Sequence, residues 1–356
     1  MKFISAICVL GLLGGATSSG ALAQESADFT LPGGVELDIY GYLKLDAIHD
    51  RDYDLGTTFW GLGSIGKPDG PRRIDDSRVQ GYESRLGVRL YAPVDFGDLK
   101  MVIEGDLYGD DPGQPRLRHG YVEMGGLTVG KTFTNFMAIE TLPSTWDFQG
   151  PAGTTFVFAP QLRYEYVSAQ GYGASVAIEQ DVSDANAMAY TAGLSRQFDR
   201  GFAKIAAISR DYETDGLGSA DGWGVMAAAV VDVWPGGTLN GGVVNGEGVS
   251  AYMNYGGRDL DMMGKPIGTT GWSLGVLQQV AEHMNVGIQY GHRHIRDYEG
   301  AQADETKRLE TLHFSFFYDP VERLTLGGEY MLGERKDFSG QTYRADRVQL
   351  GVKWAF

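Results

Sequence analysis

Apolar and polar residues alternate with a period of two in many consecutive segments of this chain. Between Val35 and Ala47, the odd positions carry only apolar residues and glycine, and the even positions include Glu, Asp and Lys. Residues 99–107 and 324–332 repeat the pattern. One such segment predicts a strand with a single apolar face. A long series of them excludes most folds, because few architectures bury one face of so many strands.

The alternation predicts about 16 strands, an even number, as bacterial outer-membrane barrels have. The predicted strands are 35–48, 78–92, 99–108, 116–124, 127–134, 160–168, 173–181, 189–198, 202–212, 222–233, 238–245, 271–281, 284–296, 307–318, 323–333 and 343–356. The segment 238–245 has the weakest pattern, because two glycines dilute it. Short connections alternate with long ones, and the long ones include 49–77, 135–159 and 246–270. Because backbone polar groups cannot stay unpaired in lipid, such a sheet has to close, first strand on last. We therefore expect an all-β fold, a closed antiparallel transmembrane β-barrel over residues 35–356.

The last predicted strand has the clearest pattern and ends on Phe356. A terminal aromatic residue on an alternating strand resembles the signal read by the barrel assembly machinery of the outer membrane. That machinery is therefore an expected partner, and outer-membrane lipid is expected around the barrel. The alternative is an ordinary edge strand.

The first 23 residues have the layout of a secretory signal peptide. Lys2 precedes an apolar run over residues 3–13, and small residues lead to a cleavage site after Ala23. The alternative is an N-terminal helix of the mature fold. Residues 24–34 would then form a short periplasmic leader. The single cysteine, Cys8, falls within the signal, so we expect no disulfide in the mature protein.

The formal net charge of −16 does not suggest nucleic-acid binding. The acids in segment 50–54 have the spacing that opens a calcium loop, but Leu55 and Gly61 stand where that loop needs glycine and glutamate. His292 and His294 share a face without further zinc ligands at a recognisable spacing. No Gly-x-Ser-x-Gly nucleophile motif occurs. We expect no enzyme activity, no cofactor and no metal site.

The connection 135–159 is long, yet apolar and aromatic. Its apolar residues are Phe136, Met137, Ile139, Leu142, Trp146, Phe148, Phe156 and Phe158. An exposed loop of this composition would be poorly soluble. We expect it to fold into the barrel as an inward third loop, with Glu140 and Asp147 as its charges. The alternative is an extracellular loop that packs on its neighbours.

Alternation also predicts which cations face the interior. Leu86 and Val88 take the lipid face of their strand, so Arg85 and Arg89 face inward. The same reasoning assigns Arg116, Arg118, Arg163 and Lys44 to the interior. A cation on the lipid face would cost ~2–4 kcal/mol at mid-depth. We predict that Arg85, Arg118 and Arg163 form a basic ladder opposite the third loop. The alternative is that these cations are merely paired with acids such as Glu83, Glu104 and Glu165.

Several sequence motifs over residues 38–166 are specific enough to be compared with known families. They are Gly41-Tyr42-Leu43-Lys44-Leu45-Asp46-Ala47, Ser84-Arg85-Leu86-Gly87-Val88-Arg89, Leu117-Arg118-His119-Gly120-Tyr121-Val122-Glu123, Val129-Gly130-Lys131-Thr132-Phe133-Thr134-Asn135-Phe136-Met137, Asp147-Phe148-Gln149-Gly150-Pro151-Ala152-Gly153 and Gln161-Leu162-Arg163-Tyr164. With these motifs the chain resembles the DcaP-like family of trimeric outer-membrane porins. The resemblance implies a homotrimer of 16-stranded barrels that passes small anionic solutes such as dicarboxylates. One departure is that residues 24–34 are too short for the helical segment that often precedes the barrel in that family.

The expected selectivity depends on where charges lie rather than on their total. Acids crowd the predicted outer loops, where salt screens charge within about 8–10 Å. At a narrow constriction with low-dielectric walls, local charge acts strongly, and there the basic candidates outnumber the acidic ones. We therefore expect a porin for passive diffusion of small hydrophilic solutes that favours anions. The alternatives are an outer-membrane barrel enzyme and a non-conducting surface adhesin.

Overall fold

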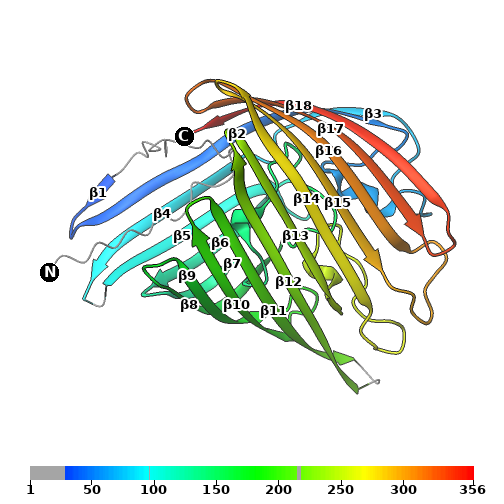
Figure 1. Ribbon diagram of the computed structural model, residues 1–356, viewed down its shortest axis with the longest axis horizontal. Coiled ribbons are helices and arrows are strands. Elements are labelled where there is room, and N and C mark those ends of the chain that lie inside the picture. The colour runs from blue at the N-terminus through cyan, green and yellow to red at the C-terminus, as the bar shows by residue number, and fades with distance from the viewer. Residues whose placement is uncertain (1–28, 96, 215–217) are drawn as a thin grey trace.

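A single antiparallel sheet closes on itself in the computed structural model, which describes residues 29–95, 97–214 and 218–356 (Figure 1). The strands are β1 (Phe29–Leu31), β2 (Val35–Arg51), β3 (Asp76–Gln80), β4 (Arg85–Val94), β5 (Gly97–Tyr108), β6 (Pro112–Met124), β7 (Leu127–Phe133), β8 (Phe158–Val167), β9 (Tyr172–Gln180), β10 (Met188–Phe198), β11 (Gly201–Thr214), β12 (Gly218–Trp234), β13 (Gly237–Glu247), β14 (Gly268–Ala281), β15 (Met284–Ile295), β16 (Thr306–Val321), β17 (Leu324–Asp337) and β18 (Thr342–Ala355). Short 3-10 helices lie in three connections: η1 (Phe59–Ser64), η2 (Ile139–Thr141) and η3 (Ser250–Tyr252).

Sixteen of the described strands, β2 and β4 to β18, form the closed ring. β18 pairs with β2, with Gln349 opposite Ile48 and Val352 opposite Leu45, so the first barrel strand lies on the last. Each of the sixteen predicted segments overlaps one of these strands, including 238–245, which lies within β13. The prediction of a closed antiparallel barrel of about 16 strands is therefore confirmed.

The strand predicted over 78–92 is divided into β3 and β4 by a turn at residues 81–84. The Ser84 N–H donates to the carbonyl of Gly81, and the Ser84 hydroxyl accepts from the backbone N–H of Lys44. A side chain therefore replaces a ladder bond at the break. β2 pairs with β3 along its C-terminal part and with β4 along its N-terminal part, so the barrel wall stays continuous.

The end of the predicted leader is a short strand. β1 pairs back on β2, with Phe29 opposite Leu37, across a turn at Gly33 and Gly34, both of which have positive φ. Glycine adopts that backbone conformation without the steric cost of a Cβ. The predicted signal peptide and its cleavage site lie outside the described residues.

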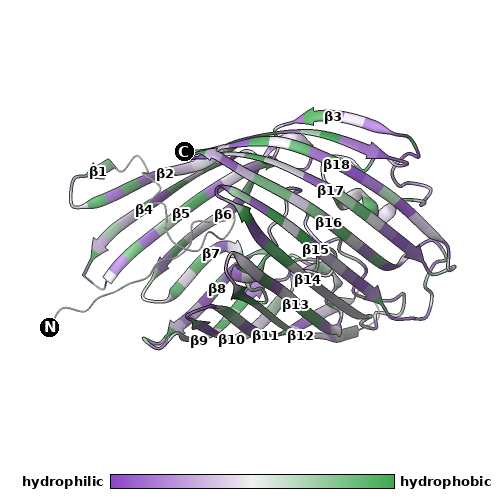
Figure 2. Cartoon of the chain, turned by 45° about the horizontal axis from the view of Figure 1, so that its top comes forward, coloured by the Kyte–Doolittle hydropathy of each residue, from purple (hydrophilic) through white to green (hydrophobic). Residues whose placement is uncertain are grey.

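Hydrophilic and hydrophobic residues alternate along the strands, as the hydropathy colouring in Figure 2 shows. Leu86 and Ile103 are 59% and 58% exposed on the outer face, whereas their neighbours Arg85 and Glu104 are 6% and 2% exposed on the inner face. The buried apolar clusters lie where connecting segments pack against the inner wall. One cluster joins Phe59 of η1 to Met331 of β17. In the described part of the chain, no helix is long and apolar enough to cross a bilayer.

Candidate solute pathway

Three arginines surround two carboxylates on the inner faces of β4, β5 and β6. Arg118 lies 2.9 Å from Glu104 and 3.0 Å from Asp106. Arg116 holds Asp106 with two hydrogen bonds, at 3.0 and 2.6 Å. Arg85 lies 3.5 Å from Glu104. We call these five residues the arginine cluster.

A β-bulge brings these groups together. Glu104 is opposite His119, but Gly105 is opposite Leu117, so Arg118 is an extra residue on β6. A bulge of this kind re-aims side chains that simple alternation would separate. His119 consequently also lies on the inner side, where it is 5% exposed and contacts the Phe133 ring.

The members of the arginine cluster differ in exposure. The side chains of Arg118, Glu104 and Asp106 are at most 1% exposed, whereas that of Arg116 is 35% exposed. Arg116 is therefore the accessible member of the arginine cluster, and its partner Asp106 is buried.

The remaining predicted cations of β2 and β4 also have acidic partners. Arg89 lies 2.9 Å from Asp38. Lys44 lies 2.6 Å from Glu83 and donates to the carbonyl of Trp146, also at 2.6 Å. These contacts agree with the alternative in which inner cations are paired with acids, although the partners include Asp38 and Asp106 as well as the acids that were expected.

Arg163 lies apart from Arg85 and Arg118. On β8, Arg163 is opposite Thr128 of β7, and Thr128 is opposite Glu123 of β6. Arg163 therefore lies nearer to the short turns than Arg118 does. No ion pair joins Arg163 to another described residue within 4.0 Å. Burial raises the pKa of the Glu140 carboxyl in η2, and the nearby charges of Lys204 and Arg163 oppose that shift. The structure therefore brings together Arg85, Arg116 and Arg118, and places Arg163 with Glu140.

The segment 134–157, the third loop, is held by carboxylates of the inner wall. At its start, Glu179 of β9 accepts from the Thr134 hydroxyl at 2.5 Å and from the Asn135 backbone N–H at 2.7 Å. Near its middle, Glu329 of β17 accepts from the backbone N–H of Trp146, whose indole N–H donates to Asp46 at 2.7 Å.

Asp147 links the third loop to β18 and to residues 52–75, the connection between β2 and β3, which we call the first connection. Its carboxylate lies 3.4 Å from Arg347 and accepts from the Phe59 N–H at 3.3 Å. Burial raises the pKa of the Asp147 carboxyl, and the Arg347 charge opposes that effect. Sequence reasoning missed Glu179, Glu329 and Arg347 as anchors. The only signal in the sequence is that each is a charged residue on the polar side of an alternating strand.

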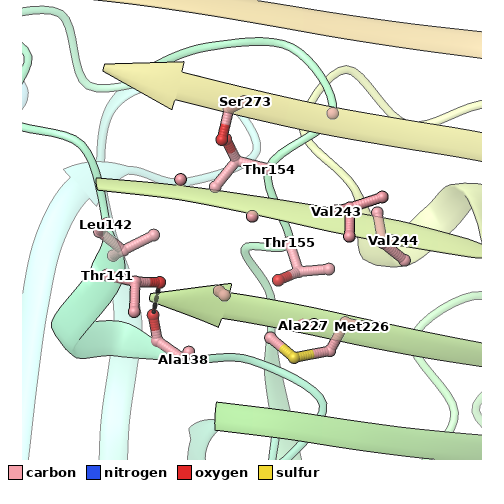
Figure 3. Close-up of a pocket in the computed structure, with 14 residues that line it drawn as sticks. Ala138, Thr141, Leu142, Thr154, Thr155, Met226, Ala227, Val243, Val244 and Ser273 are labelled. Atoms are coloured by element: carbon pink, nitrogen blue, oxygen red, sulfur yellow. Dashed lines mark hydrogen bonds between the residues drawn. The ribbon is translucent and has the colours of Figure 1, made fainter. Parts of the chain in front are cut away.

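Figure 3 shows the two ends of the third loop against β12 and β13. Ala138 and Leu142 lie on one side of a small pocket, Thr155 on another, and Met226 and Val243 on the wall. The Thr141 hydroxyl donates to the carbonyl of Ala138 at 2.8 Å. The third loop therefore contacts β12 and β13 in addition to its anchors on β2, β9 and β17.

Two of the three acids considered as the start of a calcium loop, Asp50 and Asp54, have arginine partners. Asp50 lies 2.6 Å from Arg347, and Asp54 contacts Arg78 and lies 3.3 Å from Arg72. Among the residues that the structure describes, no group of three or more His, Cys, Asp or Glu side chains is arranged to hold a metal ion.

Comparison with known proteins adds the family to this geometry. Residues 23–196 match the model of the DcaP outer membrane protein family. The structure of the outer membrane channel DcaP of Acinetobacter baumannii superposes with a TM-score of 0.83 at 23% identity, covering 92% of this chain and 99% of that chain.

Two further solved barrels are similar at lower scores. An anion-selective porin from Comamonas acidovorans gives a TM-score of 0.62 at 15% identity, over 90% of this chain and 100% of that one. Outer-membrane-expressed OmpT of Vibrio cholerae gives 0.64 at 14% identity, over 90% and 98%. At these identities the likeness concerns the fold. The search of curated proteins found no match.

Proposed function

We propose that this chain, whose residues 23–196 match the model of the DcaP outer membrane protein family, is a channel for passive diffusion that favours small anions, dicarboxylates among them. The family and the closed barrel assign the protein to the bacterial outer membrane. A barrel of about sixteen strands encloses a lumen wide enough for water and small solutes unless something fills it.

The third loop would set the width of the passage. Its polar anchors are on β2, β9, β17 and β18, and all of them are on the face opposite the exposed apolar side chains. A segment bound to several inner faces at once would lie within the lumen rather than above it. Arg116 and Arg118 contact the ring of Phe148 in this loop, with guanidinium carbons 5.5 and 5.6 Å from the ring centroid. The arginine cluster therefore borders the narrowed region.

The exposure of Arg116 over a buried Asp106 is the observation that carries the anion preference. A solute in the passage meets the guanidinium first, while the carboxylate is shielded by protein. Arg–carboxylate recognition is geometrically favourable, because the guanidinium offers several N–H donors in a plane. The similar Comamonas acidovorans protein is described as anion-selective.

One pair on the inner wall has the opposite arrangement. Lys100 and Glu123 lie 3.5 Å apart, and here the acid is the more exposed partner, 33% against 17%. This pair lies nearer the short turns than the arginine cluster does. The more exposed acid of this pair should be screened by salt in water and should affect passing ions less than Arg116 does.

Single-channel recording in planar bilayers with asymmetric potassium chloride tests the proposal. Arg116→Gln removes the accessible charge but leaves Asp106 paired with Arg118, so the reversal potential should move toward potassium. Arg344→Gln is the matched control, because Arg344 is also bound to an acid, Glu334, but is 79% exposed on the outer face. Glu123→Gln should move the potential in the opposite direction and by less.

A parent channel that prefers potassium, or an Arg116→Gln channel with unchanged selectivity, would contradict the anion proposal. Absence of any conductance would favour the adhesin. Lipid or peptide hydrolysis by the purified protein would favour the barrel enzyme.

We further propose a homotrimer. One structure of the similar Vibrio cholerae OmpT is described as a trimer form. If the leader is as short as the predicted residues 24–34, the contacts between copies would come from the barrel wall and loops. Light scattering in mild detergent should give three times the mass of one chain, and a monomeric mass would contradict the proposal.

A further inference from the structure

Five partly exposed aromatic rings follow one another from the turn between β3 and β4, past the end of β5 and the third loop, to the start of β8. We call them the aromatic track: Tyr82, Tyr108, Phe148, Phe156 and Phe158. Successive ring centroids lie 6.2, 4.8, 6.1 and 5.6 Å apart. The last ring stacks at 4.5 Å on Phe133, which is buried.

The exposure of these rings is not forced by the loop. Phe136 and Trp146 belong to the same segment and are 0% and 3% exposed. Phe148 and Phe156 stay partly open, although burying a phenylalanine fully is worth ~1.5–3 kcal/mol. A solute pathway is one place where partly open aromatic faces have a use, because solutes can cover them in passing.

A cation lies over the middle of the track. The guanidinium carbon of Arg116 is 5.8 Å from the Tyr108 centroid and 5.5 Å from that of Phe148. Asp106 takes its Nε and one terminal nitrogen, Nη2, whereas Nη1 makes no hydrogen bond with the described residues. A donor for a carboxylate therefore lies beside a partly open aromatic face.

We propose that the aromatic track and Arg116 form a weak binding site for aromatic carboxylates, with the solute ring against Phe148 and Phe156 and its carboxylate on Nη1 of Arg116. This inference rests on the proposed channel function and names a solute class for it. Uncharged sugars also stack on aromatic rings, but they offer Arg116 no charge. Small aliphatic anions pair with Arg116 without using the rings. Binding stays weak because a solute that is held tightly would block the passage.

Reversal potentials with sodium benzoate on one side and sodium chloride on the other measure the permeability of benzoate relative to chloride. Sodium cyclohexanecarboxylate is the matched probe, because it has the same charge and nearly the same size without an aromatic ring. We expect benzoate to be favoured by about three-fold or more in the parent channel, from the usual strength of aromatic pairs. Glucose should not compete with benzoate.

The double variant Phe148→Leu with Phe156→Leu should bring the benzoate-to-cyclohexanecarboxylate ratio close to one. Phe314→Leu is the control, because Phe314 is 40% exposed on the outer face and its loss should leave the ratio as in the parent. Heat-modifiable mobility on gels checks that each barrel has folded. If the double variant fails this check, Phe148→Leu alone is measured.

Equal permeability of the two acids in the parent, or a ratio that survives loss of the rings, would overturn the inference while leaving an anion-selective channel in place. A parent that prefers potassium over chloride, or that does not conduct, would overturn the proposed function as well. Competition by glucose would assign the track to sugars and also overturn the inference.

Discussion

The inner walls of β5–β6 and of β18 use the same chemistry with different surroundings. In the first, Arg116 lies 2.6 Å from Asp106, and in the second, Arg347 lies 2.6 Å from Asp50. The Arg116 side chain is 35% exposed, whereas that of Arg347 is 0% exposed. The covering groups over Arg347 come from the first connection and the third loop, which includes Asp147.

The two arginines differ in whether loop segments cover them. An uncovered arginine can meet solutes, whereas a covered arginine anchors loops. An open ion pair contributes little to stability, because water competes with it. A buried pair is costly to break, because removing one partner leaves an uncompensated charge away from water. Variants of the two walls should therefore differ in which property they change.

The largest expected effect is on stability, at Arg347. Arg347→Met leaves Asp50 and Asp147 without their cation, and we expect a loss of about 3–5 kcal/mol in the free energy of unfolding. Arg116→Met should cost about 1 kcal/mol or less, because its side chain is partly in water and Arg118 still pairs with Asp106. Denaturant or thermal unfolding in detergent measures both. Equal losses in the two variants would contradict the role assigned to cover.

A second, intermediate effect is expected where the third loop meets β17. A Cβ on Gly327 would lie 1.8 Å from the Trp146 ring, so Gly327→Ala should displace the loop. Gly287→Ala is the control, because its Cβ would meet atoms no closer than 3.5 Å on the same face. Single-channel conductance should rise and become noisier in Gly327→Ala alone. An unchanged conductance in Gly327→Ala would mean that the third loop does not set the width of the passage.

The barrel was predictable because lipid and water impose opposite demands on alternate residues of every strand. That demand acts locally, so even the glycine-diluted β13 was recognisable. The break between β3 and β4 depends on a hydrogen bond from Lys44 to Ser84, forty residues apart, and has no local pattern. The bulge at Arg118 is similar, because one extra residue on β6 moves His119 to the inner side against simple alternation.

Arg85 and Arg118 lie on the face opposite the exposed apolar side chains, and their acidic partners were only partly foreseen. Apolar composition predicted that the third loop buries residues such as Trp146. It did not predict that Glu179 and Glu329 hold this loop, since they lie 44 and 183 residues from their backbone partners. Contacts between distant segments depend on strand register, which composition does not encode.

The smallest expected effect is a pH dependence of selectivity at Glu140. This loop carboxylate is partly exposed, so it is intermediate between Arg116 and Arg347 in cover. Burial raises its pKa, and the charges of Lys204 and Arg163 oppose the shift. An acid with a raised pKa takes up its proton at a higher pH than an ordinary carboxyl. Lowering the pH from about 7 to about 5 should therefore neutralise Glu140 before exposed acids, and anion preference should increase.

Glu140→Gln should show the higher anion preference already at about pH 7 and a flatter dependence below it, because the titrating group is gone. Glu282→Gln is the control, since the Glu282 side chain is 89% exposed in a short turn and should leave the slope unchanged. Because Glu123 and Glu165 are further carboxylates of the inner wall, the difference between the two variants, rather than the parent slope, is the quantity that reports on Glu140. Equal slopes in both variants would mean that Glu140 lies too far from the ion path to act on it, and the constriction would then have to be sought nearer Arg116.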